Sequence, residues 1–143
     1  MNEITVYVEA SVYPTEDEEK VRRALKNIFP EIEFLKVEDN PSKLKGEGKS
    51  LKVLENFKSL LEKEKIRDAA KAILISSIQN KELIFYLNKQ VAFSNHISFC
   101  QPEAESPLGP ISIKVLCENP KDLINWLISW ILNGKGEKTW RLS

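Results

Sequence analysis

Apolar and polar residues alternate with period two in several short stretches, which is the pattern of strands that have one face in a core. The clearest stretches cover residues 4–10, 83–87 and 111–117. Weaker alternation over 32–37 and 96–99 predicts two further strands. Each predicted strand has one apolar face, and another layer of structure must cover that face.

Apolar residues recur at helical spacing in four other segments. Thr15 and Glu18 form a capping box, which predicts a helix that Pro30 ends. A second helix begins after Ser50, and a third follows almost at once, with Asn80 as its predicted C-cap.

The last predicted helix begins after Asn119, has Pro120 in its first turn and ends just before Gly134. Its apolar side chains cover more than half of its circumference, which is wide for a helix that packs on one side only. Either this helix lies deep in a groove on the sheet, or an edge with Trp126 and Trp130 meets a second copy of the chain in a homodimer.

The predicted elements follow the order β-α-β-α-α-β-β-β-α, and the short connections of the last three strands predict an antiparallel meander. Because each strand has one apolar face, the helices must cover a single face of the sheet. We therefore predict an α+β fold, a two-layer sandwich of a mostly antiparallel sheet with helices on one face. With 143 residues the chain is one domain by size, which we place at 1–134 with a C-terminal tail at 135–143.

Three polar residues, Asn88, Lys89 and Gln90, interrupt the alternation directly after Leu87. A strand that ends in polar residues presents them at the rim of a sheet, where functional sites are common. Their side chains suit hydrogen bonds to phosphates and to base edges. In the alternative interpretation, Asn88 makes a turn, Lys89 is solvated and Gln90 satisfies a backbone group.

The chain has no net charge, with 21 basic and 21 acidic residues, which argues against binding duplex DNA by bulk electrostatics. The charge is unevenly spread, however. Residues 1–40 hold five basic and ten acidic side chains, whereas residues 41–71 hold nine basic and five acidic ones. The glycine-containing segment with Lys43, Lys45 and Lys49 is predicted to be a mobile loop that carries a local basic patch.

The face of the sheet that helices leave uncovered would carry polar and aromatic residues. Depending on register, these are Thr5, Tyr7, Tyr86, Ser112 and Lys114. Two tyrosines on an open sheet face would suit base stacking, and they would equally form an ordinary cross-strand aromatic pair.

No pattern of catalytic residues stands out in the sequence. His96 is the single histidine, and no serine or cysteine motif accompanies it. Gly48-Lys49-Ser50 lacks the upstream glycine of a phosphate-binding loop. Cys100 and Cys117 make neither a disulfide framework nor a zinc site. We therefore expect a non-enzymatic cytoplasmic protein with no cofactor, no metal and no segment that crosses a membrane.

Five short motifs are spread over nearly the whole chain. They are Tyr13-Pro14-Thr15-Glu16, Gly48-Lys49-Ser50-Leu51, Ile66-Arg67-Asp68-Ala69-Ala70-Lys71, Phe85-Tyr86-Leu87-Asn88-Lys89-Gln90-Val91-Ala92 and Leu108-Gly109-Pro110-Ile111. Together they resemble an archaeal family of uncharacterised proteins that is catalogued as RNA-binding. The resemblance implies a fold like that of large-subunit ribosomal protein five, which holds 5S ribosomal RNA. Tyr13 stands where the family usually has asparagine, and a lysine replaces the arginine that is usual near Lys71. If these positions contact a phosphate, the first loses a hydrogen-bonding side chain and the second a bidentate donor.

The leading hypothesis is therefore a non-enzymatic protein that binds structured RNA, such as ribosomal RNA. The expected contact residues are polar, basic or aromatic: Asn88, Lys89, Gln90, Lys43, Lys45, Lys49 and Tyr86. The alternative is a protein–protein interaction module that dimerises through the last helix and binds no nucleic acid.

Overall fold

A computed structural model describes residues 3–101, 108–129, 131–132 and 138–139. The main sheet is formed by β1 (Ile4–Val12), β2 (Leu35–Val37), β3 (Ser42–Gly48), β4 (Ile78–Gln79), β5 (Glu82–Asn88), β6 (Phe99–Cys100) and β7 (Pro110–Cys117). The helices are α1 (Glu18–Ile28), the 3-10 helix η1 (Leu51–Leu54), α2 (Glu55–Glu64), α3 (Arg67–Ser76), α4 (Lys89–Phe93) and α5 (Pro120–Leu127). Two short strands, β8 (Ile131–Leu132) and β9 (Lys138–Thr139), pair separately.

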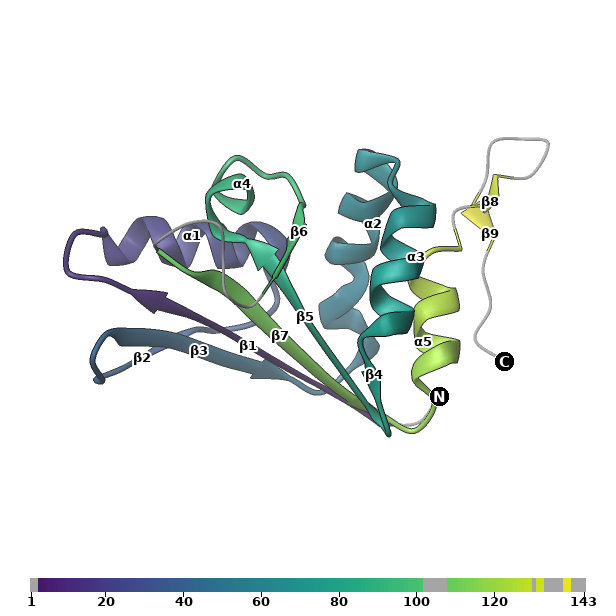
Figure 1. Ribbon diagram of the computed structural model, residues 1–143, viewed down its shortest axis with the longest axis horizontal. Coiled ribbons are helices and arrows are strands. Elements are labelled where there is room, and N and C mark those ends of the chain that lie inside the picture. Colours follow the sequence, from purple (N-terminus) through teal and green to yellow (C-terminus); the bar gives the residue numbers. More distant parts are fainter. Residues whose placement is uncertain (1–2, 102–107, 130, 133–137, 140–143) are drawn as a thin grey trace.

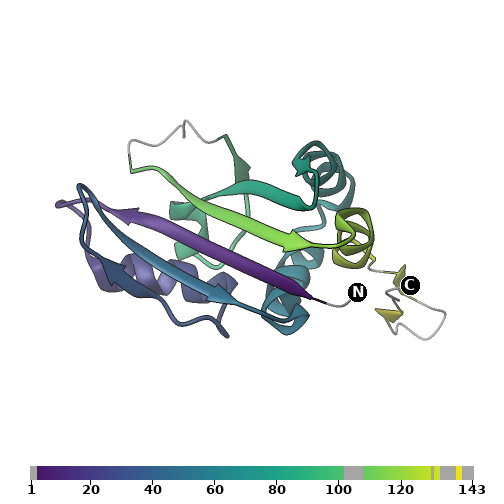
Figure 2. The ribbon, with the colours of Figure 1, turned by 90° about the horizontal axis from the view of Figure 1, so that it is seen from below.

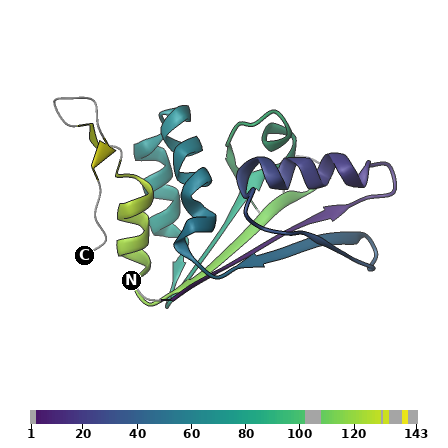
Figure 3. The ribbon, with the colours of Figure 1, turned by 180° about the vertical axis from the view of Figure 1, so that it is seen from behind.

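The helices lie on one side of the sheet, as the views from the front and from behind show (Figures 1 and 3). Every strand pair in the sheet is antiparallel. These observations confirm the predicted α+β two-layer architecture. None of the helices in the described part of the chain is long and apolar enough to cross a membrane. The predicted division into a domain and a tail stays a prediction, because most of 135–143 lies outside the described residues.

The strands follow the order β2-β3-β1-β7-β5-β4, with β6 also paired to β5. The strand β7 therefore lies between β1 and β5 (Figure 2). The predicted meander is wrong in its order, although its strands are antiparallel. The two strands differ in how much of β5 they pair with. The short β6 pairs only with Tyr86 and Leu87, whereas β7 pairs with the whole of β5, from Glu82 to Asn88.

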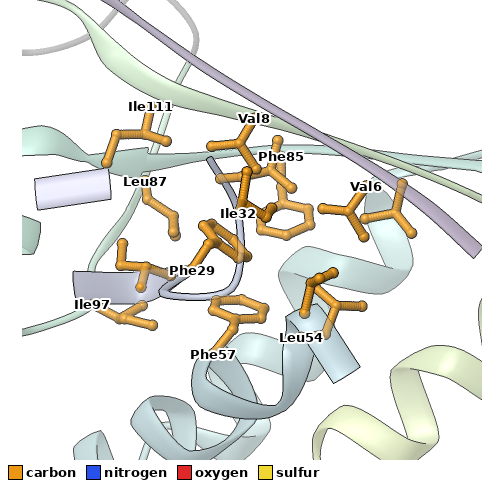
Figure 4. Close-up of a cluster of buried hydrophobic side chains, with 14 of the residues drawn as sticks. Val6, Val8, Phe29, Ile32, Leu54, Phe57, Phe85, Leu87, Ile97 and Ile111 are labelled. Carbon is orange, nitrogen blue, oxygen red and sulfur yellow. The ribbon is translucent and has the colours of Figure 1, made fainter. Parts of the chain in front are cut away.

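The core lies between the sheet and the helices (Figure 4). The rings of Phe29, Phe57 and Phe85 form a chain with centroid separations of 6.0 and 5.6 Å. Phe29 follows α1, Phe57 comes from α2 and Phe85 comes from β5. One aromatic cluster therefore packs α1 and α2 against the sheet. Burial of each such side chain stabilises the fold by about 1.5–3 kcal/mol.

The segment predicted as a mobile loop forms the strand β3, so that prediction is wrong. Leu44 is the only apolar side chain that β3 buries, and Gly46 occupies the next position on the covered face. A Cβ atom at Gly46 would lie 2.6 Å from both Ile32 Cγ2 and the Glu33 carbonyl oxygen. Glycine is therefore needed where the chain before β2 crosses β3.

Two predicted helix caps are also wrong. Asp17, not Thr15, is the N-cap of α1, and its carboxylate accepts a hydrogen bond from the backbone nitrogen of Glu19 at 2.9 Å. Thr15 lies inside a turn that the Glu16 nitrogen closes by donating to the Tyr13 carbonyl at 2.9 Å. Asn80 adopts a positive φ of 59° in the turn between β4 and β5 instead of capping α3.

The last helix begins as predicted, because the Asn119 side chain accepts a hydrogen bond from the backbone nitrogen of Asp122 at 3.2 Å. Trp126 on this helix is fully buried within the chain. The Lys58 ammonium donates to the Trp126 carbonyl at 2.6 Å and lies over the indole ring. Trp126 therefore offers no exposed indole for the homodimer contact that the sequence suggested, and Trp130 lies outside the described residues.

Candidate functional site

The strands β3, β1, β7 and β5 lie side by side on the face of the sheet that the helices leave uncovered (Figure 2). Alternate side chains of these strands point to that face. Strand register places Lys45, Glu9, Ser112 and Tyr86 in one row across these strands. The neighbouring row contains Glu47, Tyr7, Lys114 and Ile84. The positions predicted for Tyr7, Tyr86, Ser112 and Lys114 on this face are thus confirmed.

These two rows border a shallow hollow with a volume of ≈ 460 Å³. Both tyrosines line it, together with Glu9, Lys45 and Lys114. Tyr7 is 40% exposed and Tyr86 is half-buried. Since β7 separates their strands and the register offsets them by two residues, the Cα atoms of the two tyrosines lie roughly 12 Å apart on this face. The hollow therefore combines aromatic surface with cationic and anionic groups.

The lysines of the uncovered face are paired with glutamates. The Glu9 carboxylate lies 3.7 Å from the Lys43 ammonium and 3.9 Å from that of Lys45. On the far side of the hollow, Lys114 pairs with Glu82 at 3.4 Å. On β1, β3, β5 and β7 this face carries three lysines and three glutamates: Lys43, Lys45, Lys114, Glu9, Glu47 and Glu82. The face is therefore close to neutral.

The polar residues at the junction of β5 and α4, Asn88, Lys89 and Gln90, each have a different role. Asn88 is the N-cap of α4, where its side-chain oxygen accepts a hydrogen bond from the Val91 nitrogen at 2.9 Å. Gln90 is exposed and lines a smaller hollow of ≈ 200 Å³ with Lys20 and Phe93, between α1 and α4. The sequence predicts a strand over 96–99 after β5, and the structure has the shorter strand β6 there, with the unpredicted short helix α4 between the two strands.

Lys89 is 5% exposed, so its ammonium is not offered to a ligand at the surface. It donates to the Ser11 carbonyl at 2.9 Å and to both carboxylate oxygens of Glu16 at 3.1 Å. Burial lowers the pKa of Lys89, and the Glu16 carboxylate opposes that shift. The expectation that Lys89 contacts RNA does not agree with this burial.

The predicted cationic residues do not form one exposed basic patch. Lys89 is buried against Glu16, and Lys43 and Lys45 share Glu9. Lys49, past the end of β3, is 76% exposed and lies 3.9 Å from Glu47. Of the predicted contact residues, the structure brings Lys45 and Tyr86 together in the larger hollow.

Glu9 and Lys114 line the hollow but were not among the contact residues predicted from the sequence, and Glu9 was not singled out at all. It lies on the polar side of a correctly predicted strand, but its partners lie on β3, which the sequence did not reveal as a strand. The available signal was the alternation of Lys43, Lys45 and Glu47 with Leu44 and glycines. This alternation is weak because the covered side of β3 has one leucine, and its other residues are serine and glycines.

A protein-family model described as RNA binding matches residues 5–117. A UPF0201 protein from Sulfurisphaera tokodaii is 40% identical over 124 residues, which are 85% of this chain and 85% of that protein. One from Thermococcus onnurineus is 39% identical over 123 residues, or 85% and 89% of the two chains. The chain belongs to the UPF0201 family.

A crystal structure of a UPF0201 protein from Methanococcus jannaschii resembles this fold with a TM-score of 0.78 and 32% identity. The similarity covers 87% of this chain and 98% of that one. The expected archaeal family is thus confirmed, whereas the expected likeness to ribosomal protein five stays a prediction. The descriptions of the family model and of these UPF0201 relatives name no catalytic activity.

Proposed function

We propose that this UPF0201 protein binds RNA on the uncovered face of its sheet. The observation that carries the proposal is the hollow in which Tyr7, Tyr86, Lys45 and Lys114 meet. Aromatic rings on an open sheet stack on unpaired bases, and nearby lysines contact phosphates. The RNA-binding description of the family model supports the same class of ligand.

The contact set differs from the one that the sequence suggested. Tyr86 and Lys45 remain and are joined by Tyr7 and Lys114 in the hollow, with Lys43 beside it. Lys49 follows the end of β3 and is largely exposed beside Glu47. Three predicted residues are left out of the contact set. Asn88 caps α4, Lys89 is buried, and Gln90 lines a different hollow.

The neutral charge of the face predicts how the RNA is held. A lysine that contacts a phosphate must first leave its glutamate partner, so each phosphate contact contributes little net energy. Base stacking contributes about 1–3 kcal/mol per base. It neutralises no phosphate and releases no counterion, so this contribution depends little on salt. We therefore expect the ligand to be RNA with unpaired bases, for example the loops of a structured RNA, and a shallow salt dependence.

The test is fluorescence anisotropy with a labelled single-stranded RNA of mixed sequence at about 50 mM salt, the low end of the usual range. We expect Tyr7→Ala and Tyr86→Ala each to raise Kd by about 5-fold to 100-fold, since each removes one stacking partner. Phe93→Ala is the matched control, because Phe93 is a similarly exposed aromatic residue, at 39%, on α4.

Two results would contradict the proposal. One is the absence of binding at protein concentrations up to about 100 μM, the weak end of non-specific affinity. The other is a loss of binding in Phe93→Ala with none in the tyrosine variants. Circular dichroism of each variant shows whether it has kept its fold.

A further inference from the structure

Glu9 has an unusual position for a carboxylate in an RNA-binding hollow. It lies on β1 two residues from Tyr7, and on the cross-strand row that ends at Tyr86. Its side chain is 40% exposed. A carboxylate repels phosphates, so a surface that recognised only the RNA backbone would be weakened by Glu9. The same group is a strong acceptor for the N–H donors of bases.

The Glu9 oxygens are available for such donors. Their distances to the Lys43 and Lys45 ammonium groups, 3.7 and 3.9 Å, are longer than hydrogen bonds. The lysines therefore neutralise the carboxylate without occupying its lone pairs at hydrogen-bond distance. A ligand can bind to these oxygens without displacing a protein donor.

Lys45 and Glu9 together present a donor beside two acceptors. The Watson–Crick edge of guanine presents the complementary set, the O6 acceptor followed by the N1–H and N2–H donors. Adenine and cytosine each place a ring-nitrogen acceptor next to a single amino donor, and uracil has one donor between two acceptors. Of the four bases, only guanine offers two adjacent donors to a carboxylate.

The spacing on the strand suits this arrangement. Residues two apart on one strand are separated by about 6.8 Å. A base that stacks on the Tyr7 ring can therefore reach Glu9 with one edge. We propose that the uncovered face selects unpaired guanine, with Glu9 and Lys45 as the residues that determine specificity; this inference rests on the proposed RNA-binding function.

The test compares four labelled RNA hexamers: r(UUGGUU), r(UUAAUU), r(UUUUUU) and the first with inosine in place of both guanosines. Inosine keeps N1–H and lacks the N2 amino group. We expect the protein to bind the guanosine hexamer about 5-fold to 100-fold more tightly than the adenosine hexamer, with inosine in between.

Two variants assign the preference to a residue. In Glu9→Gln the amide nitrogen faces one of the guanine donors, so the preference falls to near one, while affinity for r(UUUUUU) stays equal or rises. Glu82→Gln is the matched control, because it removes a carboxylate paired to a lysine on the same face but outside the lining of the hollow. This control keeps the preference for guanine.

The outcomes separate the two proposals. If the hexamers bind equally well and binding depends on the tyrosines, the guanine inference is overturned and the RNA-binding proposal survives. If guanine preference persists in Glu9→Gln, Glu9 is not the determinant and the inference is likewise overturned. If no hexamer binds at about 50 mM salt, the RNA-binding proposal fails, and the guanine inference fails with it.

Discussion

Two lysine–glutamate pairs of this protein contain the same groups in opposite surroundings. Lys89 and Glu16 are 5% and 11% exposed and lie 3.1 Å apart. Lys45 and Glu9 are 48% and 40% exposed and lie 3.9 Å apart. In the first pair water is replaced by protein groups, so both charges depend on each other. In the second pair water solvates both charges, so either can exchange its partner for a ligand.

The comparison shows why residue type alone did not locate the site. Lys89 has the chemistry of a phosphate ligand, but its ammonium joins the end of β1 to the start of α1 and of α4. Lys45 has the same chemistry and remains accessible. The difference is made by burial, which depends on tertiary contacts.

The largest expected effect comes from breaking the buried pair. Lys89→Met should lower the free energy of unfolding by about 3–5 kcal/mol, because it leaves the Glu16 carboxylate buried without its cation. Urea denaturation measures this loss. The double variant Glu16→Gln with Lys89→Met removes both charges and should recover part of it. A Lys89→Met variant as stable as the parent would show that the pair is not structurally needed.

A second prediction compares adjacent residues of β3 that face opposite sides of the sheet. Gly46→Ala should cost about 1–3 kcal/mol, because its Cβ would lie 2.6 Å from the Glu33 carbonyl oxygen and from Ile32. The control is Lys45→Ala, whose side chain lies on the uncovered face and should change the urea midpoint little. Equal costs for both would contradict the assignment of the two faces.

The Glu64 side chain is 22% exposed, which is intermediate between the buried and the exposed lysine–glutamate pairs. Its Oε2 atom lies 2.7 Å from His96 Nδ1. The hydrogen bond from His96 lowers the pKa of Glu64, and partial burial opposes this shift. A carboxylate with a lowered pKa stabilises the fold above its ordinary pKa and loses that contribution as the pH falls through its folded value.

We therefore expect Glu64→Gln to reduce the unfolding free energy at neutral pH by about 1 kcal/mol or less. This difference from the parent protein should disappear in strong acid. Urea titrations at a series of pH values between neutrality and strong acid measure it. A difference that stays constant down to strong acid would exclude the charge of Glu64 as its cause.

The smallest expected effect on stability comes from breaking the exposed pair. Lys45→Met should change the unfolding free energy by no more than about 0.5 kcal/mol. It should nevertheless weaken the binding of RNA that contains unpaired guanine, because the proposed hydrogen bond from the Lys45 ammonium to the guanine O6 atom is lost. A large loss of stability would remove the distinction between the two pairs.

The sequence predicted most of the architecture because most strands carry strong alternation. Ile4, Val6 and Val8 identify β1, and Ile111, Ile113 and Val115 identify β7. The strand β3 was missed because its covered side offers a single leucine among serine and glycines. Gly46 is required by the segment before β2 that crosses it, and Gly48 by the close approach of the Val53 side chain, and no local pattern records either contact.

The site was predictable in part. Period-two spacing placed Tyr7 and Tyr86 on the uncovered face, and the register then brought them to one hollow. The burial of Lys89 depends on Glu16, which lies 73 residues earlier in the chain. The pairing of Glu9 with Lys45 required a strand that the sequence did not reveal. Long-range partners of this kind decide which charged residues are available to a ligand.

The position of β7 between β1 and β5 has a consequence for biosynthesis. Until residues 110–117 leave the ribosome, β1 and β5 each have a free edge of backbone donors and acceptors. The nascent chain thus carries two incomplete half-sheets that a late segment joins. Chains truncated before Pro110 should therefore associate edge to edge and sediment as aggregates rather than as small folded monomers.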